Sequence, residues 1–200
     1  MSAHHHVEHA EHTEHIAHSN KKVALLIAVI ALFLAFSETL GKSAQTSALN
    51  YQIEASNLWN FFQAKNIRRT VTIVAAEHAK VEALAAADPA LKDALAKQID
   101  TWTKTAERYR SEPEAGGGKG EGTVELSRRA LEEQEKRDTA LARYHHYEIA
   151  SAAFQIGIVL CSAAVVTGMM VLAFIAGGLT LIGLGFTGIG LFAPHAVHLF

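Results

Sequence analysis

The sequence predicts an all-α, three-pass helical membrane protein with a long extramembrane helical stalk, folded as a coiled-coil hairpin. Residues 149–200 contain no Asp, Glu, Lys or Arg. Because one helical crossing of a bilayer needs about 20 apolar residues, this run is long enough for two crossings. A third apolar run covers residues 23–36, and the charged region between the two is rich in Ala, Glu, Lys and Leu without strand-like alternation.

Residues 1–21 form a His- and Glu-rich tail that we expect to be disordered. Imidazole and carboxylate groups are ligands for Zn, Ni and Cu. A flexible, redundant set of ligands does not define one coordination geometry, so a metal-handling tail and a tail whose charge simply rises as the pH falls are both open interpretations. The candidate metal ligands are His4, His5, His6, His9, His12, His15 and His18.

The first membrane helix is predicted over residues 22–42. Its apolar part is short enough to resemble the central region of a secretory signal, with Lys21 and Lys22 as the basic flank. No small-residue cleavage site follows at the expected distance. We therefore expect a helix that is retained in the membrane, with Glu38 near its far boundary.

The stalk is predicted over residues 43–148 as three helices and one loop. Asp88 suits the N-cap position of the second helix, and Pro89 suits its first turn, where a missing N–H group has no cost. The Gly-rich stretch before the third helix indicates a flexible loop near the tip of the stalk. The expected ranges are 43–87, 89–112 and 123–148 for the helices and 113–122 for the loop.

A repeat of seven residues marks one face of the first stalk helix. A strict seven-residue repeat is typical of a left-handed coiled coil, and one polar residue in such a seam can set register or oligomer state. The repeat predicts packing either against the same chain or against another subunit, and both interpretations stay open. Its members are Ile53, Asn60, Ile67, Val74 and Val81.

Trp59, Phe61 and Phe62 form an aromatic cluster that suits either a helix–helix core or a protein docking site. The block around them, residues 54–68, reads Glu-Ala-Ser-Asn-Leu-Trp-Asn-Phe-Phe-Gln-Ala-Lys-Asn-Ile-Arg. With this block, the chain resembles the DUF4337 family of uncharacterised bacterial membrane proteins along nearly its full length. The resemblance implies the architecture and a bacterial setting, and it brings no activity, substrate or catalytic residue.

The apolar carboxy-terminal run is predicted to form two antiparallel membrane helices, at residues 149–176 and 179–200, joined by a turn at Gly177 and Gly178. Small residues let membrane helices approach closely, so we expect tight packing within this hairpin or between subunits. The glycines that carry this expectation are Gly183, Gly185, Gly188 and Gly190. Cys161 is expected to be a small packing residue.

Composition and motifs argue against several classes of function. The 18 Lys and Arg residues are interleaved with 20 Asp and Glu residues, so no basic patch for nucleic acid emerges. The sequence offers no nucleophile–base pair, no cofactor motif and no acid at the middle of a predicted span. We therefore expect neither an enzyme nor a proton-coupled transporter.

The leading hypothesis is a non-enzymatic, homo-oligomeric protein of the bacterial inner (cytoplasmic) membrane that acts as scaffold or accessory subunit of a larger membrane assembly. Its expected partners are the lipid bilayer, further copies of itself and another membrane protein complex. The alternative is an oligomeric channel or divalent-metal-handling protein whose tail collects Zn, Ni or Cu at a pore mouth. Lys21 and Lys22 favour a cytoplasmic amino terminus, whereas Lys42 and Arg143 favour a cytoplasmic stalk, so both orientations stay open, with the stalk charges closest to the membrane favouring the second.

Overall fold

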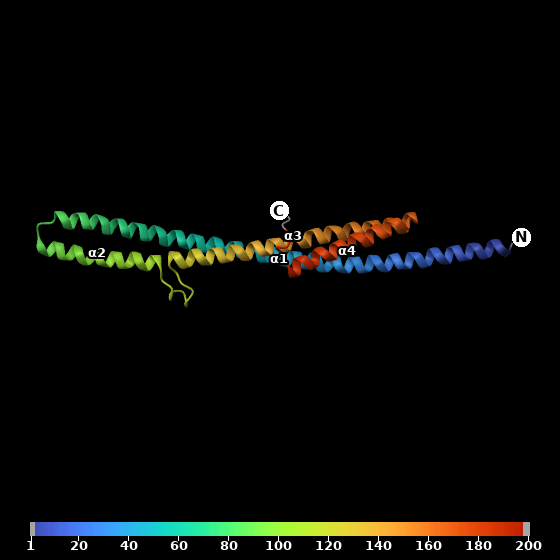
Figure 1. Cartoon of the computed structure of the whole chain (residues 1–200), viewed down its shortest axis with the longest axis horizontal. Helices are drawn as coiled ribbons and strands as arrows, with labels where there is room; N and C mark the ends of the chain where they lie inside the picture. The colour runs from blue at the N-terminus through green and yellow to red at the C-terminus, as the bar shows by residue number, and fades with distance from the viewer. Residues whose placement is uncertain (1–2, 198–200) are drawn as a thin grey trace. The chain divides into compact units, whose positions relative to one another are not determined.

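The computed structural model describes the backbone of residues 3–197 and the side chains of residues 21–197. Four helices follow one another along the chain: α1 (Ala3–Ala85), α2 (Pro89–Arg110), α3 (Thr123–Thr167) and α4 (Met170–Phe192) (Figure 1). The described residues contain no strand, which confirms the all-α class.

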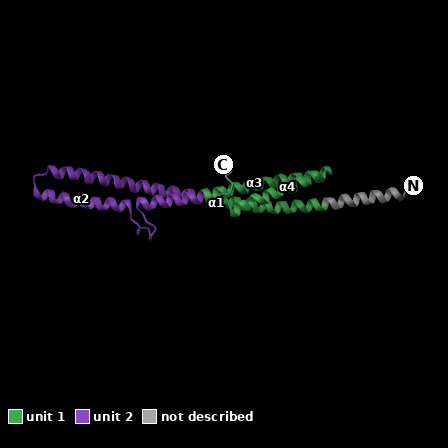
Figure 2. Ribbon diagram, viewed as in Figure 1, with its two compact units in different colours: residues 1–48, 138–200 green, residues 49–137 purple. Residues whose placement is uncertain are grey.

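The chain divides into two compact units (Figure 2). The first unit comprises residues 1–48 and 138–200, and the second comprises residues 49–137. Both α1 and α3 contribute residues to each unit, whereas α2 belongs to the second unit and α4 to the first.

Apolar side chains fill the interior of the first unit. Small residues dominate this core, and the ring of Phe154 stacks on Phe33 with the ring centroids 6.1 Å apart. Cys161 is fully buried here, in the packing role that its position predicts. The fully or nearly buried members are Val23, Ile30, Ala150, Phe154, Cys161, Ala164, Ala173 and Ala176.

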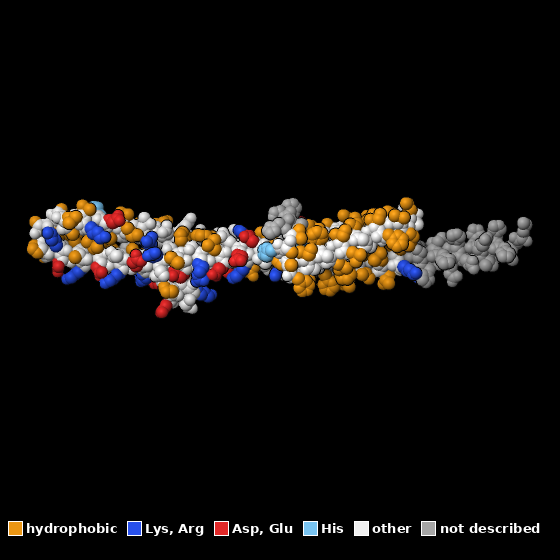
Figure 3. Space-filling model, viewed as in Figure 1, with side chains coloured by type: hydrophobic (Ala, Val, Ile, Leu, Met, Phe, Trp, Pro, Cys, Tyr) orange, Lys and Arg blue, Asp and Glu red, His pale blue; other side chains and the backbone are white. Residues whose placement is uncertain are grey.

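Among the described residues, three helices have the length and hydropathy needed to cross a membrane. They are Lys21–Ala85, Thr123–Thr167 and Met170–Phe192. In the first unit, large apolar side chains also cover the outside, among them Phe174, Leu181 and Phe192, which are all more than two-thirds exposed. Lys, Arg, Asp and Glu gather instead over the second unit (Figure 3).

The turn between the two carboxy-terminal helices lies at Gly168, and the sequence-based position at Gly177–Gly178 is wrong. Gly168 has φ +73°, which a glycine adopts without a Cβ clash. Gly177 and Gly178 lie inside α4. With the turn at Gly168, the charge-free part of α3, residues 149–167, is about 28 Å long, whereas residues 149–176 would make about 42 Å.

The last helix also differs from the expected range of 179–200 at both ends. It begins at Met170 and ends at Phe192, and Ala193 takes a non-helical conformation before Pro194. A residue that precedes proline is disfavoured in the helical region by a clash with the proline ring. Pro194 therefore ends the helix, whereas the absence of charged residues alone predicted that it continues to residue 200.

In the second unit, α2 and the adjoining part of α3 pack against α1 and run antiparallel to it (Figure 1). Asp88 caps α2 because its Oδ1 atom accepts a hydrogen bond from the Ala90 N–H group at 3.0 Å. The apolar centre is small: Leu58 packs with Leu126 and Ala130. With so little apolar volume at the centre, close approach of the helices depends on small side chains and on polar contacts.

Candidate interaction surfaces

In the second unit, α1 packs through a row of residues that we call the inner seam. Its members recur at alternating steps of three and four, the spacing of a coiled-coil seam. Most are small or polar, which allows the helix backbones to approach closely. They are Ala55, Leu58, Phe62, Lys65, Arg69, Thr72, Ala76 and Ala79, and all are buried or half-buried.

The seven-residue repeat predicted for α1 lies on the opposite side of the helix. We call Ile53, Asn60, Ile67, Val74 and Val81 the outer stripe. The first four members each precede an inner-seam residue by two positions, a rotation of about 200° around an α-helix. Its four apolar side chains are between 50% and 67% exposed, and Asn60 is exposed as well. Packing against the same chain therefore does not use this stripe.

The row beside the outer stripe is exposed too. Val71 is 63% exposed, and Ala64 and His78 also face outward. Together the two rows make an apolar band along α1 in which Asn60 and His78 are the polar members. Exposed large apolar residues are normal one at a time, but a contiguous band is typical of an interaction site.

The three residues of the aromatic cluster do not share one role, although the sequence allows either a helix–helix core or a docking site. Trp59 and Phe62 pack on Leu58 and its neighbours, with their own rings 5.4 Å apart in an edge-to-face arrangement. Phe61 stays 38% exposed, and its ring centre lies 5.5 Å from the Lys65 ammonium. Two of the three aromatic rings thus serve the fold, and the third lies at the surface.

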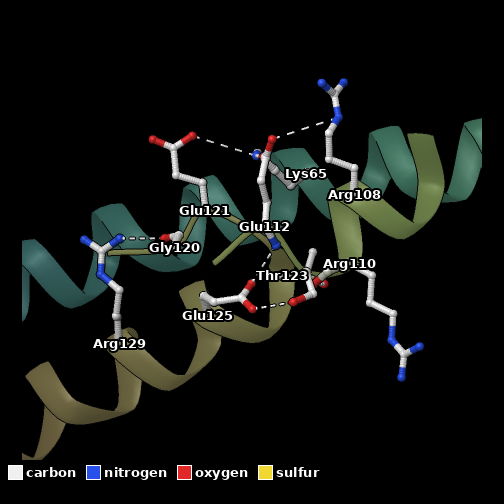
Figure 4. Close-up of polar contacts among 10 residues, drawn as sticks. Lys65, Arg108, Arg110, Glu112, Gly120, Glu121, Thr123, Glu125 and Arg129 are labelled. Carbon is white, nitrogen blue, oxygen red and sulfur yellow. Dashed lines mark hydrogen bonds and ion pairs between the residues drawn. The ribbon is translucent and has the colours of Figure 1, made fainter. Parts of the chain in front are cut away.

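Lys65 is a buried cation on the inner seam (Figure 4). Its side chain is 9% exposed and its Nζ atom donates a hydrogen bond to Glu112 Oε2 at 2.9 Å. Glu121 Oε2 lies 3.8 Å from the same ammonium, and the ring centre of Tyr109 lies 5.9 Å away. The hydrogen bond from Lys65 lowers the pKa of the Glu112 carboxyl below its ordinary value.

Further polar contacts fasten the loop between α2 and α3 (Figure 4). Glu125 accepts hydrogen bonds from the Ser111 hydroxyl at 2.6 Å and from the Glu112 N–H group at 3.3 Å. Arg129 donates to the Gly120 carbonyl at 3.1 Å. The loop therefore lies beside Lys65 and away from the turn between α1 and α2, which corrects its expected position near the tip of the stalk.

The glycines of α4 fall into two groups. A Cβ atom on Gly183 would come within 2.7 Å of the Phe154 ring, and one on Gly190 would come within 2.8 Å of the Tyr147 ring. These two glycines therefore allow α3 and α4 to pack closely within the hairpin. Gly185 and Gly188 have no neighbour within 4 Å of such an atom among the described residues, so the hairpin does not use them.

Histidines beside the apolar segments make packing and hydrogen-bonding contacts. His146 is fully buried, stacks on Phe186 and lies 3.0 Å from the Pro194 carbonyl oxygen through Nε2. His195 Nε2 lies 3.1 Å from the Thr139 hydroxyl. These contacts tie the segment after α4 back to α3.

The structure does not test the predicted metal ligands. His4, His5, His6, His9, His12, His15 and His18 lie outside the residues whose side chains are described. Within residues 21–197, no group of three or more His, Cys, Asp or Glu side chains is placed to hold a metal ion.

Lys65 is a candidate site residue that the sequence pattern alone does not identify. The signal was present, because Lys65 occupies an inner-seam position where coiled coils ordinarily bury apolar side chains. The outer stripe gives the stronger hydropathy signal because its residues are larger and more apolar. The small and polar side chains of the inner seam give a weaker hydropathy signal than the exposed outer stripe.

Comparison with known protein families places the chain in a family. The family described as a domain of unknown function, DUF4337, matches residues 19–193. No curated protein and no solved structure matches the chain.

Proposed function

The chain belongs to the DUF4337 family, and we propose that it is a non-enzymatic, three-pass membrane protein that self-associates through α1. It would act as a scaffold or as an accessory subunit of a larger membrane assembly. The observation that carries this proposal is the outer stripe, an apolar heptad repeat that the chain's own packing leaves exposed.

Energetics favour a partner on this stripe. Burying one Val or Ile side chain fully is worth about 1.5–3 kcal/mol. Ile67 and Val74 lie one heptad apart with Val71 between them, so one partner helix would cover all three at once. A helix that kept this band in water would forgo that free energy over several turns.

A second copy of the chain fits the stripe best. A seven-residue repeat matches a partner helix that has the same repeat, because both then follow one left-handed supercoil. Copies that are anchored in one membrane by the same helices have the same orientation, so their α1 helices meet in parallel and in register. Asn60 then faces Asn60, and this pairing of buried amides disfavours other registers.

Three long apolar helices support the membrane setting of this proposal. In water, the exposed apolar exterior of α4 would be unfavourable, whereas in lipid it needs no cover. We place the chain in the cytoplasmic membrane of a bacterium, in keeping with its resemblance to bacterial membrane proteins, and the stalk in the cytoplasm, because Lys42 and Arg143 lie next to the apolar segments.

Site-directed disulfide cross-linking in native membranes tests the association. We expect Ile67→Cys and Val74→Cys to give cross-linked dimers upon mild oxidation. Asn66→Cys is the matched control, because Asn66 is exposed but lies about 100° around the helix from Ile67. The natural Cys161 is fully buried and should remain unreactive.

The outcomes separate the versions of the proposal. Dimers from the stripe variants without dimers from the control support self-association through α1. Monomers throughout would refute it, as would equal cross-linking at Asn66→Cys, which indicates random collision. Cross-links to a different protein would point to an accessory subunit that uses the same stripe.

A further inference from the structure

An open cavity of about 440 Å³ lies between α1 and α3 within the first unit. Its walls come from residues 37–45 and 144–155. Both helices change there from apolar to charged sequence, since residues 23–36 and 149–192 contain no Asp, Glu, Lys or Arg. In a protein anchored as proposed above, this groove lies at the depth of the lipid headgroups.

Close helix contact forms the floor of the groove. Ser37 is fully buried and donates a hydrogen bond to the Tyr147 carbonyl at 3.0 Å. A Cβ atom on Gly41 would lie 3.5 Å from the Cβ atom of Tyr147, so the two backbones approach without an intervening side chain. Longer side chains on either side of this contact then make the walls.

The walls carry two acids and one base. Glu38 Oε1 accepts a hydrogen bond from Gln155 at 3.2 Å, and Glu148 Oε1 accepts one from the Tyr144 hydroxyl at 3.4 Å. Glu148 Oε2 also lies 3.7 Å from His145 Nδ1, and both carboxylates keep further lone pairs for another donor. Lys42 makes no ion pair within 4 Å in the described part of the chain, so its ammonium has no counter-ion there.

We propose that this groove binds the headgroup of phosphatidylethanolamine, a zwitterionic lipid with a primary ammonium group. Lys42 contacts the phosphate, and Glu38 and Glu148 accept hydrogen bonds from the ammonium. The proposal rests on the membrane anchoring proposed above, but not on self-association through α1.

Charge and hydrogen bonding select this headgroup over the other common ones. The charged groups in the wall sum to one negative charge, which disfavours a lipid whose head is purely anionic. A choline head carries a positive charge but no N–H donor for the carboxylates. The apolar rows that continue from the groove contain Leu34 on α1 and the exposed Val159 on α3, along which an acyl chain can lie.

Native mass spectrometry of the full chain tests the proposal. The protein is reconstituted with an equimolar mixture of phosphatidylethanolamine, phosphatidylcholine and phosphatidylglycerol that have identical acyl chains, and the retained lipids are counted. We expect phosphatidylethanolamine to be retained several-fold above its share. Retention in proportion to supply, or a preference for phosphatidylglycerol, would overturn the proposal.

Three variants locate the site. Glu38→Gln and Glu148→Gln should each lower phosphatidylethanolamine retention several-fold, and Lys42→Gln should lower the retention of both zwitterionic lipids. Lys22→Gln is the matched control, because Lys22 is exposed at the other end of the same apolar segment. Unchanged retention in all three groove variants would refute the assignment. Because Glu148→Gln leaves the Glu38–Gln155 contact intact, it remains informative if Glu38→Gln fails to fold.

The same spectra separate this proposal from the scaffold proposal. Lipid preference in a protein that stays monomeric would support the groove and contradict self-association. Dimers without lipid preference would support self-association and contradict the groove proposal. Alkaline extraction of the membranes tests the anchoring on which the groove depends, and release of the protein there would overturn the lipid site.

Discussion

Lys65 illustrates how much a single buried charge can organise in a stalk with a small apolar core. It lies on α1, contacts Glu112 beyond the end of α2 and Glu121 near the start of α3, and packs beside the Phe61 ring. A lysine without these partners would be costly at a position that is 7% exposed. Lys65 therefore ties α1 to both ends of the loop that joins α2 and α3.

The pH dependence of stability tests the Lys65 contact. The folded-state pKa of Glu112 is lowered by the hydrogen bond from Lys65, so the contact stabilises the folded chain above the unfolded pKa of about 4.5 and loses this effect as the pH falls through the folded value. We expect Glu112→Gln to lower the melting temperature by a few degrees near pH 7 and by less below about pH 4.

Circular dichroism of the full chain in detergent measures both melting temperatures. Glu114→Gln is a suitable control, because Glu114 lies in the same loop and is exposed. Should Glu112→Gln lower the melting temperature equally at both pH values, the ion pair would not be the source of the stability.

At the scale of the elements, the turn between α3 and α4 depends on one residue whose importance composition alone does not reveal. The chain offers Gly168 and the pair Gly177–Gly178 as breaks in a charge-free run. Only Gly168 adopts a left-handed conformation, with φ +73°. The glycine pair, although more conspicuous in the sequence, continues α4 without interruption.

Alanine substitutions at these glycines have opposite expected signs. Gly168→Ala should destabilise the hairpin by about 1–2 kcal/mol, because a Cβ atom in the left-handed region meets the following carbonyl oxygen. Gly177→Ala should be neutral or stabilise by up to about 1 kcal/mol, because alanine loses less entropy in a helix interior and open space surrounds that position. Thermal unfolding in detergent measures both changes, and the reverse order would place the turn at the glycine pair.

At the scale of the whole molecule, the sequence predicted the helical class, the three long apolar helices and the capped start of α2, because each depends on local composition or on one or two adjacent residues. It left open whether the outer stripe of α1 packs against the same chain or against another subunit, because periodicity identifies a stripe without identifying what covers it. The groove beside Glu38 and the contacts of Lys65 join residues far apart in the chain, so they required coordinates.

The amino-terminal tail supplies a prediction that separates the two functions that the sequence suggests. The surfaces proposed for assembly lie at residues 53–81, and those proposed for lipid binding lie at residues 37–45 and 144–155. Neither set includes the tail. Deletion of residues 2–18 should therefore leave the oligomer mass and the retained lipid unchanged in native mass spectrometry.

Metal binding should respond differently to the same deletion. The truncation removes His4, His5, His6, His9, His12, His15 and His18. Because neutral imidazole is the ligand form, any Zn affinity of the intact chain should weaken as the pH falls below about 6.5, and it should disappear in the truncated chain. Titration calorimetry at two pH values measures this affinity. A truncated chain that loses its oligomer together with its Zn affinity would favour the metal-handling channel, since assembly would then depend on the tail and not on the outer stripe.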